Sequence, residues 1–64
     1  MIPERDIWRA ATLLIGEHRG DAELVAARRA DEMLEDGDRN GKFVWLRIKR
    51  AIGDLLAAPV GKPH

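Results

Sequence analysis

Apolar residues recur along this chain at intervals of three and four, which is the spacing of one face of an α-helix. In the first segment this stripe consists of Ile7, Ala11, Leu14, Ile15 and His18, with Trp8 at its edge. No stretch alternates apolar and polar residues as a half-buried strand would. The pattern predicts three helices, over residues 4–19, 21–36 and 39–57.

Glycine and aspartate residues separate these segments. Gly20 and Gly37 each follow a predicted helix, where glycine adopts the left-handed C′ conformation without strain. Asp21 and Asp38 come next, and aspartate is a favourable N-cap. The sequence therefore predicts an all-α fold, a compact three-helix domain with short glycine-containing turns. We expect this domain to span residues 1–58, and we expect a frayed C-terminal tail over residues 59–64, after Pro59.

The predicted core is small for a domain that must fold alone. Nine of the apolar residues are alanines, and a chain of this length buries only about 60% of its unfolded surface. The stripe Ala22, Ala26 and Ala30 would let a neighbouring helix approach closely. The side chains predicted to form the core are Ile7, Trp8, Leu14, Ile15, Ala26, Ala30, Met33, Leu34, Trp45, Ile48, Ile52 and Leu55.

Five apolar residues do not fit the stripes that form this core. They are Leu13, Leu24, Val25, Phe43 and Leu46. In a chain with so small a core, we interpret them as a candidate interaction surface, used for self-association or for another protein. The alternative is that the assumed helix phases are wrong by some tens of degrees, in which case these side chains belong to the core.

Charge is balanced overall but unevenly distributed. Lys and Arg number 11, as do Asp and Glu, so the formal net charge is zero. Residues 21–38 carry seven acids and two bases, whereas residues 39–64 carry six bases and one acid. The third helix thus has a candidate basic face of Lys42, Lys49 and Arg50. Such a face either pairs with the acidic helix, or is simply solvated, or contacts nucleic acid.

Nothing in the sequence indicates catalysis, a cofactor or a metal. Serine, cysteine and tyrosine are absent, so their nucleophiles are excluded. The segment Asp36–Gly41 matches the first half of an EF-hand calcium loop, but the twelfth position is Arg47 instead of glutamate. Capping roles for Gly37 and Asp38 explain the same residues more simply. We expect His18 to hydrogen-bond a free carbonyl at the end of the first helix.

The amino terminus does not have the pattern of a secretory signal. Glu4, Arg5 and Asp6 interrupt it before any apolar run forms. No apolar run approaches the roughly 20 residues of a membrane span. We therefore expect a cytoplasmic protein with no membrane partner.

The order of several short motifs is similar to that of a known family. These motifs are Asp6-Ile7-Trp8, Ala10-Ala11, Leu14-Ile15, His18, Asp21-Ala22, Arg29-Ala30-Asp31, Met33-Leu34, Gly37-Asp38, Gly41, Val44-Trp45 and Arg47-Ile48. They resemble a family of short, uncharacterised, all-helical bacterial proteins, mainly alphaproteobacterial, which form a domain of unknown function. The resemblance covers about residues 4–56 and implies a small cytoplasmic helical domain of unknown function, and it assigns no catalytic or binding roles to particular residues. In the family, histidine is followed directly by glycine at the first turn. Here Arg19 separates His18 from Gly20, so the first turn is one residue longer than in the family.

These observations favour a non-enzymatic protein-interaction module that self-associates, as a homodimer. The alternative is a small nucleic-acid-binding or regulatory protein that uses Lys42, Lys49 and Arg50. Nucleic acid is the less expected partner, because Asn40 is the only amide side chain available to contact base edges.

Overall fold

The computed structural model describes residues 2–57, and within that range the predicted all-α fold is confirmed. The elements are α1 (Glu4–His18), a 3₁₀ turn η1 (Arg19–Asp21), α2 (Ala22–Glu35) and α3 (Arg39–Ala57). Their bounds agree with the predicted ranges to within one residue. The predicted tail, residues 59–64, lies outside the described residues.

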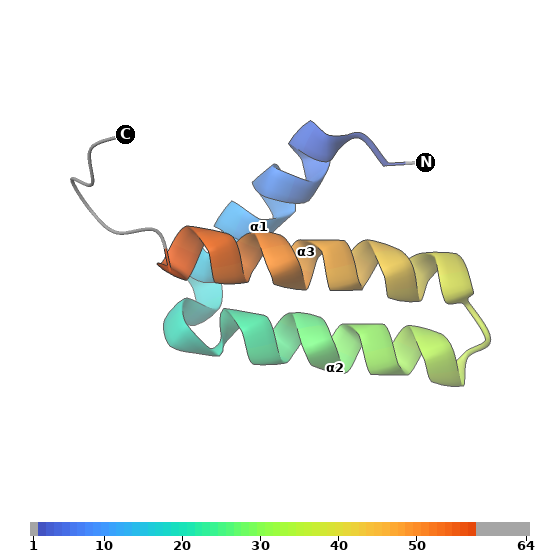
Figure 1. Cartoon of the computed structure of the whole chain (residues 1–64). Coiled ribbons are helices and arrows are strands. Elements are labelled where there is room, and N and C mark those ends of the chain that lie inside the picture. Colours follow the sequence, from blue (N-terminus) through green and yellow to red (C-terminus); the bar gives the residue numbers. More distant parts are fainter. Residues whose placement is uncertain (1, 58–64) are drawn as a thin grey trace.

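The helices α2 and α3 form an antiparallel hairpin, and α1 crosses α3 obliquely (Figure 1). Contacts between α2 and α3 are the most extensive in the molecule, and α1 packs mainly on α3 and little on α2. The hairpin is therefore the body of the fold, and α1 covers only one of its two broad sides.

Among residues 2–57, the buried core contains only three large side chains. They are Ile7 from α1 and Ile48 and Ile52 from α3, each 5% exposed or less. The other buried positions are the alanines Ala11, Ala22, Ala26, Ala30 and Ala51. Small side chains at these positions let the helix backbones approach closely, as the alanine stripe of α2 predicts. The core is tight but contributes little apolar area.

Partly buried side chains surround this core, including Trp8, Leu14, Ile15 and Trp45. Two residues predicted to be buried are instead exposed, Leu34 by 48% and Leu55 by 41%. Next to Leu34 in sequence, Met33 is the α2 side chain that reaches α3, with its Sδ against Gly41. Leu55 lies beyond the level at which α2 begins, because Glu23 of α2 is already level with Gly53.

The first connection differs from its prediction. Arg19, not Gly20, has the positive φ, at 53°, and Gly20 lies inside η1. Asp21 has a helical backbone and its side chain makes no capping hydrogen bond, because the 3₁₀ turn runs directly into α2. His18 is exposed, and its nearest acidic neighbour is Glu17, at 4.0 Å. Its predicted hydrogen bond to a free carbonyl is not formed.

The second connection has the geometry that glycine and aspartate favour. Gly37 has a φ of 79°. Its N–H donates to the carbonyl of Leu34 at 3.0 Å, and the N–H of Asp38 donates to the carbonyl of Met33 at 2.8 Å. This pair of bonds is the Schellman motif, which satisfies carbonyls at the end of a helix. Asp38 then begins α3, since its carboxylate accepts a hydrogen bond from the N–H of Gly41.

Candidate interaction surface on the α2–α3 hairpin

One broad side of the hairpin carries a continuous row of residues from both helices, which we call the hairpin face. From α2 it contains Leu24, Ala27, Asp31 and Leu34, and from α3 it contains Lys42, Leu46, Lys49, Gly53 and Leu56. Within each helix these positions are three or four residues apart, so each set occupies a single stripe.

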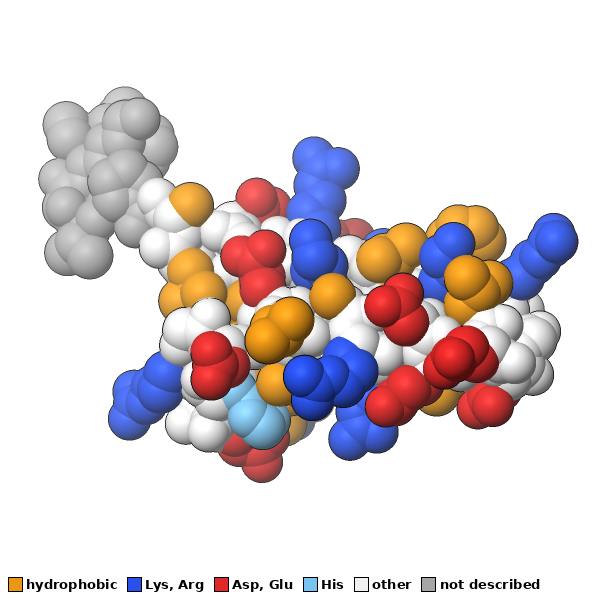
Figure 2. Space-filling model, turned by 90° about the horizontal axis from the view of Figure 1, so that it is seen from below, with side chains coloured by type: hydrophobic (Ala, Val, Ile, Leu, Met, Phe, Trp, Pro, Cys, Tyr) orange, Lys and Arg blue, Asp and Glu red, His pale blue; other side chains and the backbone are white. Residues whose placement is uncertain are grey.

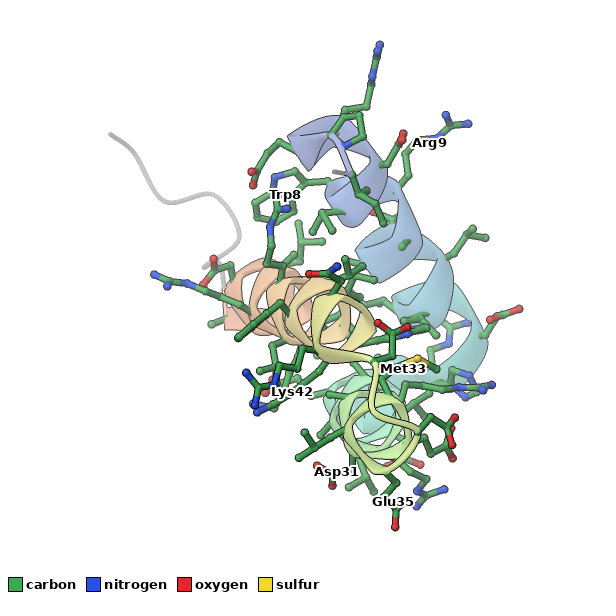
Figure 3. The ribbon with its side chains drawn as sticks, turned by 90° about the vertical axis from the view of Figure 1, so that its right-hand side faces the viewer. Trp8, Arg9, Asp31, Met33, Glu35 and Lys42 are labelled. Carbon is green, nitrogen blue, oxygen red and sulfur yellow. The ribbon has the colours of Figure 1, made fainter. Side chains whose placement is uncertain are left out.

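Contacts between the helices show that the two stripes lie on the same side. Nζ of Lys49 lies 3.8 Å from Oε2 of Glu23, and the Glu23 carboxylate also lies against Gly53. The opposite side of α3 meets α1, where Ala51 and Arg47 line a cleft with Trp8. Figure 3 looks along the hairpin, with Lys42 and Asp31 on one side of it and α1 on the other. The hairpin face is therefore the side that α1 leaves uncovered.

The hairpin face is apolar at intervals along its whole length. Its four leucines, Leu24, Leu34, Leu46 and Leu56, are 58%, 48%, 38% and 46% exposed. Single exposed leucines are normal on a protein surface. Here four of them lie on one face of a molecule that buries only three large side chains. The face thus exposes more large apolar side chains than the core contains.

Charges of opposite sign lie between these leucines. Its acids, Glu23 at the edge and Asp31, belong to α2, and its bases, Lys42 and Lys49, belong to α3. No charged side chain is buried among the described residues. Figure 2 shows the underside of the molecule, where acidic side chains lie near the α2–α3 turn and at the opposite end, with apolar side chains exposed between charges. Charges of both signs are therefore exposed on this face and can pair with a partner.

The candidate interaction residues predicted from the sequence do not all come together. Leu24 and Leu46 lie on the hairpin face, whereas Val25 is half-buried on another side of α2. Phe43 projects from the outer flank of α3, beneath the ammonium of Lys42 at 5.9 Å from its ring centroid. Leu13 is 66% exposed on α1, beside Trp8, Arg9 and Thr12.

Sequence reasoning missed Leu34 and Leu56 as members of this surface. The signal was present, because residues 42, 46, 49, 53 and 56 alternate steps of four and three, as do 24, 27, 31 and 34. This is the heptad spacing of a helix that packs against another helix. Two lysines and an aspartate among these positions conceal the pattern.

The candidate basic face is divided between two sides of α3. Lys42 and Lys49 lie on the hairpin face, and Lys49 pairs with Glu23. Arg50 lies instead in the cleft between α1 and α3. A phosphate backbone would need these cations on one side, so this arrangement gives less support to nucleic-acid binding.

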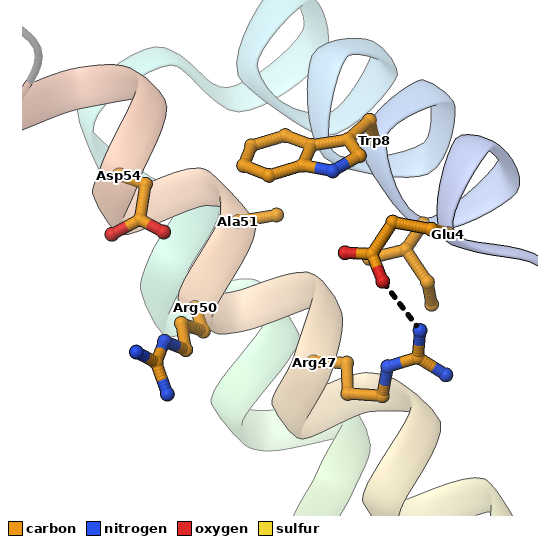
Figure 4. Close-up of a pocket in the computed structure, with 7 residues that line it drawn as sticks. Glu4, Trp8, Arg47, Arg50, Ala51 and Asp54 are labelled. Atoms are coloured by element: carbon orange, nitrogen blue, oxygen red, sulfur yellow. Dashed lines mark hydrogen bonds and ion pairs between the residues drawn. The ribbon is translucent and has the colours of Figure 1, made fainter.

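The cleft between α1 and α3 has a volume of about 280 Å³ and holds charges of both signs. Figure 4 shows the Trp8 ring above Ala51, with Arg50 and Asp54 on one rim. On the other rim, Oε2 of Glu4 lies 3.1 Å from Nη2 of Arg47. The Glu4–Arg47 pair joins α1 to α3, and the charged groups of the cleft do not form a nucleophile–base arrangement.

The described residues contain no cluster of three or more potential metal ligands. In the calcium-like segment, Oδ1 of Asp38 is already bonded to the backbone of Gly41. Gly37 and Asp38 thus have the capping roles that explain this segment without a cation. Across residues 2–57, no helix has both the length and the apolar character needed to cross a bilayer.

The chain matches no family model, and no curated protein or solved structure is significantly similar to it.

Proposed function

We propose that this three-helix domain with short glycine-containing turns is a non-enzymatic protein-interaction module that forms a homodimer through the hairpin face. The observation that carries the proposal is the group Leu24, Leu34, Leu46 and Leu56, each between 38% and 58% exposed on one side of the hairpin. Covering these side chains would complete a core that holds only three large residues.

The magnitude of the apolar contribution indicates a weak dimer. Full burial of a leucine stabilises by about 1.5–3 kcal/mol, so eight half-exposed leucines in a symmetrical pair contribute about 6–12 kcal/mol. Association costs about 4–15 kcal/mol, because the two chains lose translational and rotational freedom. The surplus is at most about 8 kcal/mol, which corresponds to a Kd of about 1 μM or weaker.

Sedimentation equilibrium tests the proposal directly. We expect the molar mass to rise from that of a monomer to that of a dimer between about 0.05 μM and about 1 mM, a range that begins well below this Kd. The variant Leu46→Asp places a charge in the middle of the face and should remain monomeric throughout this range.

The matched control is Leu13→Asp. It introduces the same charge at a leucine that is 66% exposed on α1, away from the hairpin face. This variant should dimerise like the parent chain. A parent chain that stays monomeric at all concentrations would refute self-association, and equal effects of the two variants would refute the assignment to this face.

A further inference from the structure

We infer that two copies of this chain pair with their two-fold axis parallel to α2 and α3, so that α2 of each protomer packs antiparallel on α3 of its partner. The inference rests on the proposed self-association through the hairpin face. It adds the geometry of the pair, the charges that select it and the register of the two chains.

A symmetrical pair that packs two hairpins face to face has two simple arrangements. In a two-fold dimer both copies use the same surface, and the axis lies in the plane between them. If the two-fold axis lies across the helices, that is, perpendicular to them in the interface plane, α2 packs on the partner's α2 and α3 packs on the partner's α3. An axis along the helices places α2 on the partner's α3. The observed surface must be complementary to itself in one of these two ways.

The charges on the hairpin face distinguish these arrangements. The axis across the helices would bring Glu23 and Asp31 toward the same carboxylates of the other copy, and lysines toward lysines. Like charges across an interface are unfavourable. The axis along the helices brings the acids of α2 toward the partner's Lys42 and the partner's Lys49. Charge therefore favours the arrangement of α2 on α3.

This choice of axis also fixes the register. Rotation about an axis parallel to the helices leaves every residue at its original height. Residues that are level within one hairpin are therefore also level between the two copies. The Glu23 carboxylate lies against Gly53 and Sδ of Met33 lies against Gly41, so the residues of each pair are level to within about one helical turn. With a helical rise of about 1.5 Å per residue, Ala27 is level with Leu46 to within about one turn.

The sizes of the side chains are compatible with this register. Leu24 of one copy meets the partner's Gly53, and Leu46 meets the partner's Ala27. These two leucines thus each face a glycine or an alanine, as in the packing of a knob into a hole. Gly53 has a second consequence, because a Cβ there would lie 3.3 Å from Oε1 of Glu23 and displace the acid that faces the partner's α3.

Disulfide cross-linking tests this geometry, and the chain is suited to it because it has no cysteine. The variants Ala27→Cys and Leu46→Cys are prepared separately, one with a tag that changes its mass, then mixed and oxidised with copper phenanthroline. We expect the disulfide between the two variants to form readily in the mixture. Each variant alone should cross-link little, since identical residues lie diagonally across a four-helix arrangement, beyond the roughly 7 Å limit between Cα atoms. Leu13→Cys, on α1, should cross-link with neither.

The outcomes separate this inference from the proposed function. If the parent chain sediments as a dimer but Ala27→Cys cross-links with itself as well as with Leu46→Cys, self-association stands and the geometry is wrong. If the parent chain is a monomer throughout, both proposals fail.

Salt gives a second measurement that needs no substitution. Attraction between α2 and α3 predicts a Kd that rises a few fold when sodium chloride is increased from about 0.05 M to about 0.5 M, whereas repulsion between like helices predicts a fall.

Discussion

Oδ1 of Asp38 accepts a hydrogen bond of 2.8 Å from the backbone N–H of Gly41. The backbone N–H of Asp38 meanwhile donates to the carbonyl of Met33. One residue therefore closes the end of α2 and begins α3. The two roles together fix the turn of the hairpin, and with it the alignment of the two stripes on the hairpin face.

Loss of this cap should be measurable in the stability of the chain. We expect Asp38→Ala to lower the free energy of unfolding by about 1 kcal/mol. In a domain of this size that corresponds to a fall in Tm of about 4–8 °C. Asp38→Asn should retain most of the stability, because the amide oxygen can accept the same bond. Thermal melts followed by circular dichroism measure the difference. Asp36→Ala is the control, and an equal loss in both variants would contradict the capping role.

Two glycines in helices should respond in opposite ways to alanine. A Cβ on Gly16 would have nothing within 4 Å, so Gly16→Ala should stabilise α1 by about 0.5–1 kcal/mol through its higher helix propensity. A Cβ on Gly41 would lie 2.6 Å from Oδ2 of Asp38 and 2.9 Å from Sδ of Met33. Gly41→Ala must move the capping carboxylate, so it should destabilise the chain. Urea unfolding measures both, and equal stabilisation by the two variants would contradict the close approach at Gly41.

The two connections show what local sequence does and does not determine. At Gly37 and Asp38 the preferences of glycine and aspartate agree with the positions that the backbone requires, so the pattern predicts the roles of both residues. At the first connection Asp21 has φ −87° and ψ −1°. This backbone is helical, whereas a capping residue is extended. The η1 turn, and not a capped loop, joins α1 to α2, and no local preference indicates that choice.

The positive φ at Arg19 leads to a prediction about the first connection. Arg19 has φ 53° and ψ −125°, a region that strongly favours glycine. Arg19→Gly should stabilise the chain by about 1 kcal/mol, once the larger entropy of glycine in the unfolded state is subtracted. Gly20→Ala should be tolerated, because a Cβ there meets nothing within 4 Å and its φ is not positive. Equilibrium unfolding measures the stability of both variants. Destabilisation by Gly20→Ala would instead support a left-handed conformation of Gly20 at the end of the first helix, as the sequence predicts.

The candidate site was only partly predictable from the sequence. Leu24 and Leu46 are recognisable because they fall outside the stripes that form the core. Leu34 is not recognisable in this way, because helical periodicity places it beside Met33 on the buried side. In the fold it is Met33, not Leu34, whose side chain contacts α3 at Gly41. Periodicity gives the direction of a side chain, whereas exposure depends on the neighbouring helix.

Apolar packing, rather than ion pairing, should hold α1 on the hairpin. Ile7 is 2% exposed, so Ile7→Ala should cost about 2–5 kcal/mol and unfold much of the population at room temperature. The Glu4–Arg47 pair joins the same two helices at 3.1 Å, but its side chains are 72% and 41% exposed. Exposed pairs contribute at most about 1 kcal/mol, so Glu4→Gln should lower stability by about 0.5 kcal/mol or less. Urea titrations at low and high salt measure both variants. A larger loss for Glu4→Gln than for Ile7→Ala would show that the charge pair, not the apolar contact, fixes the position of α1.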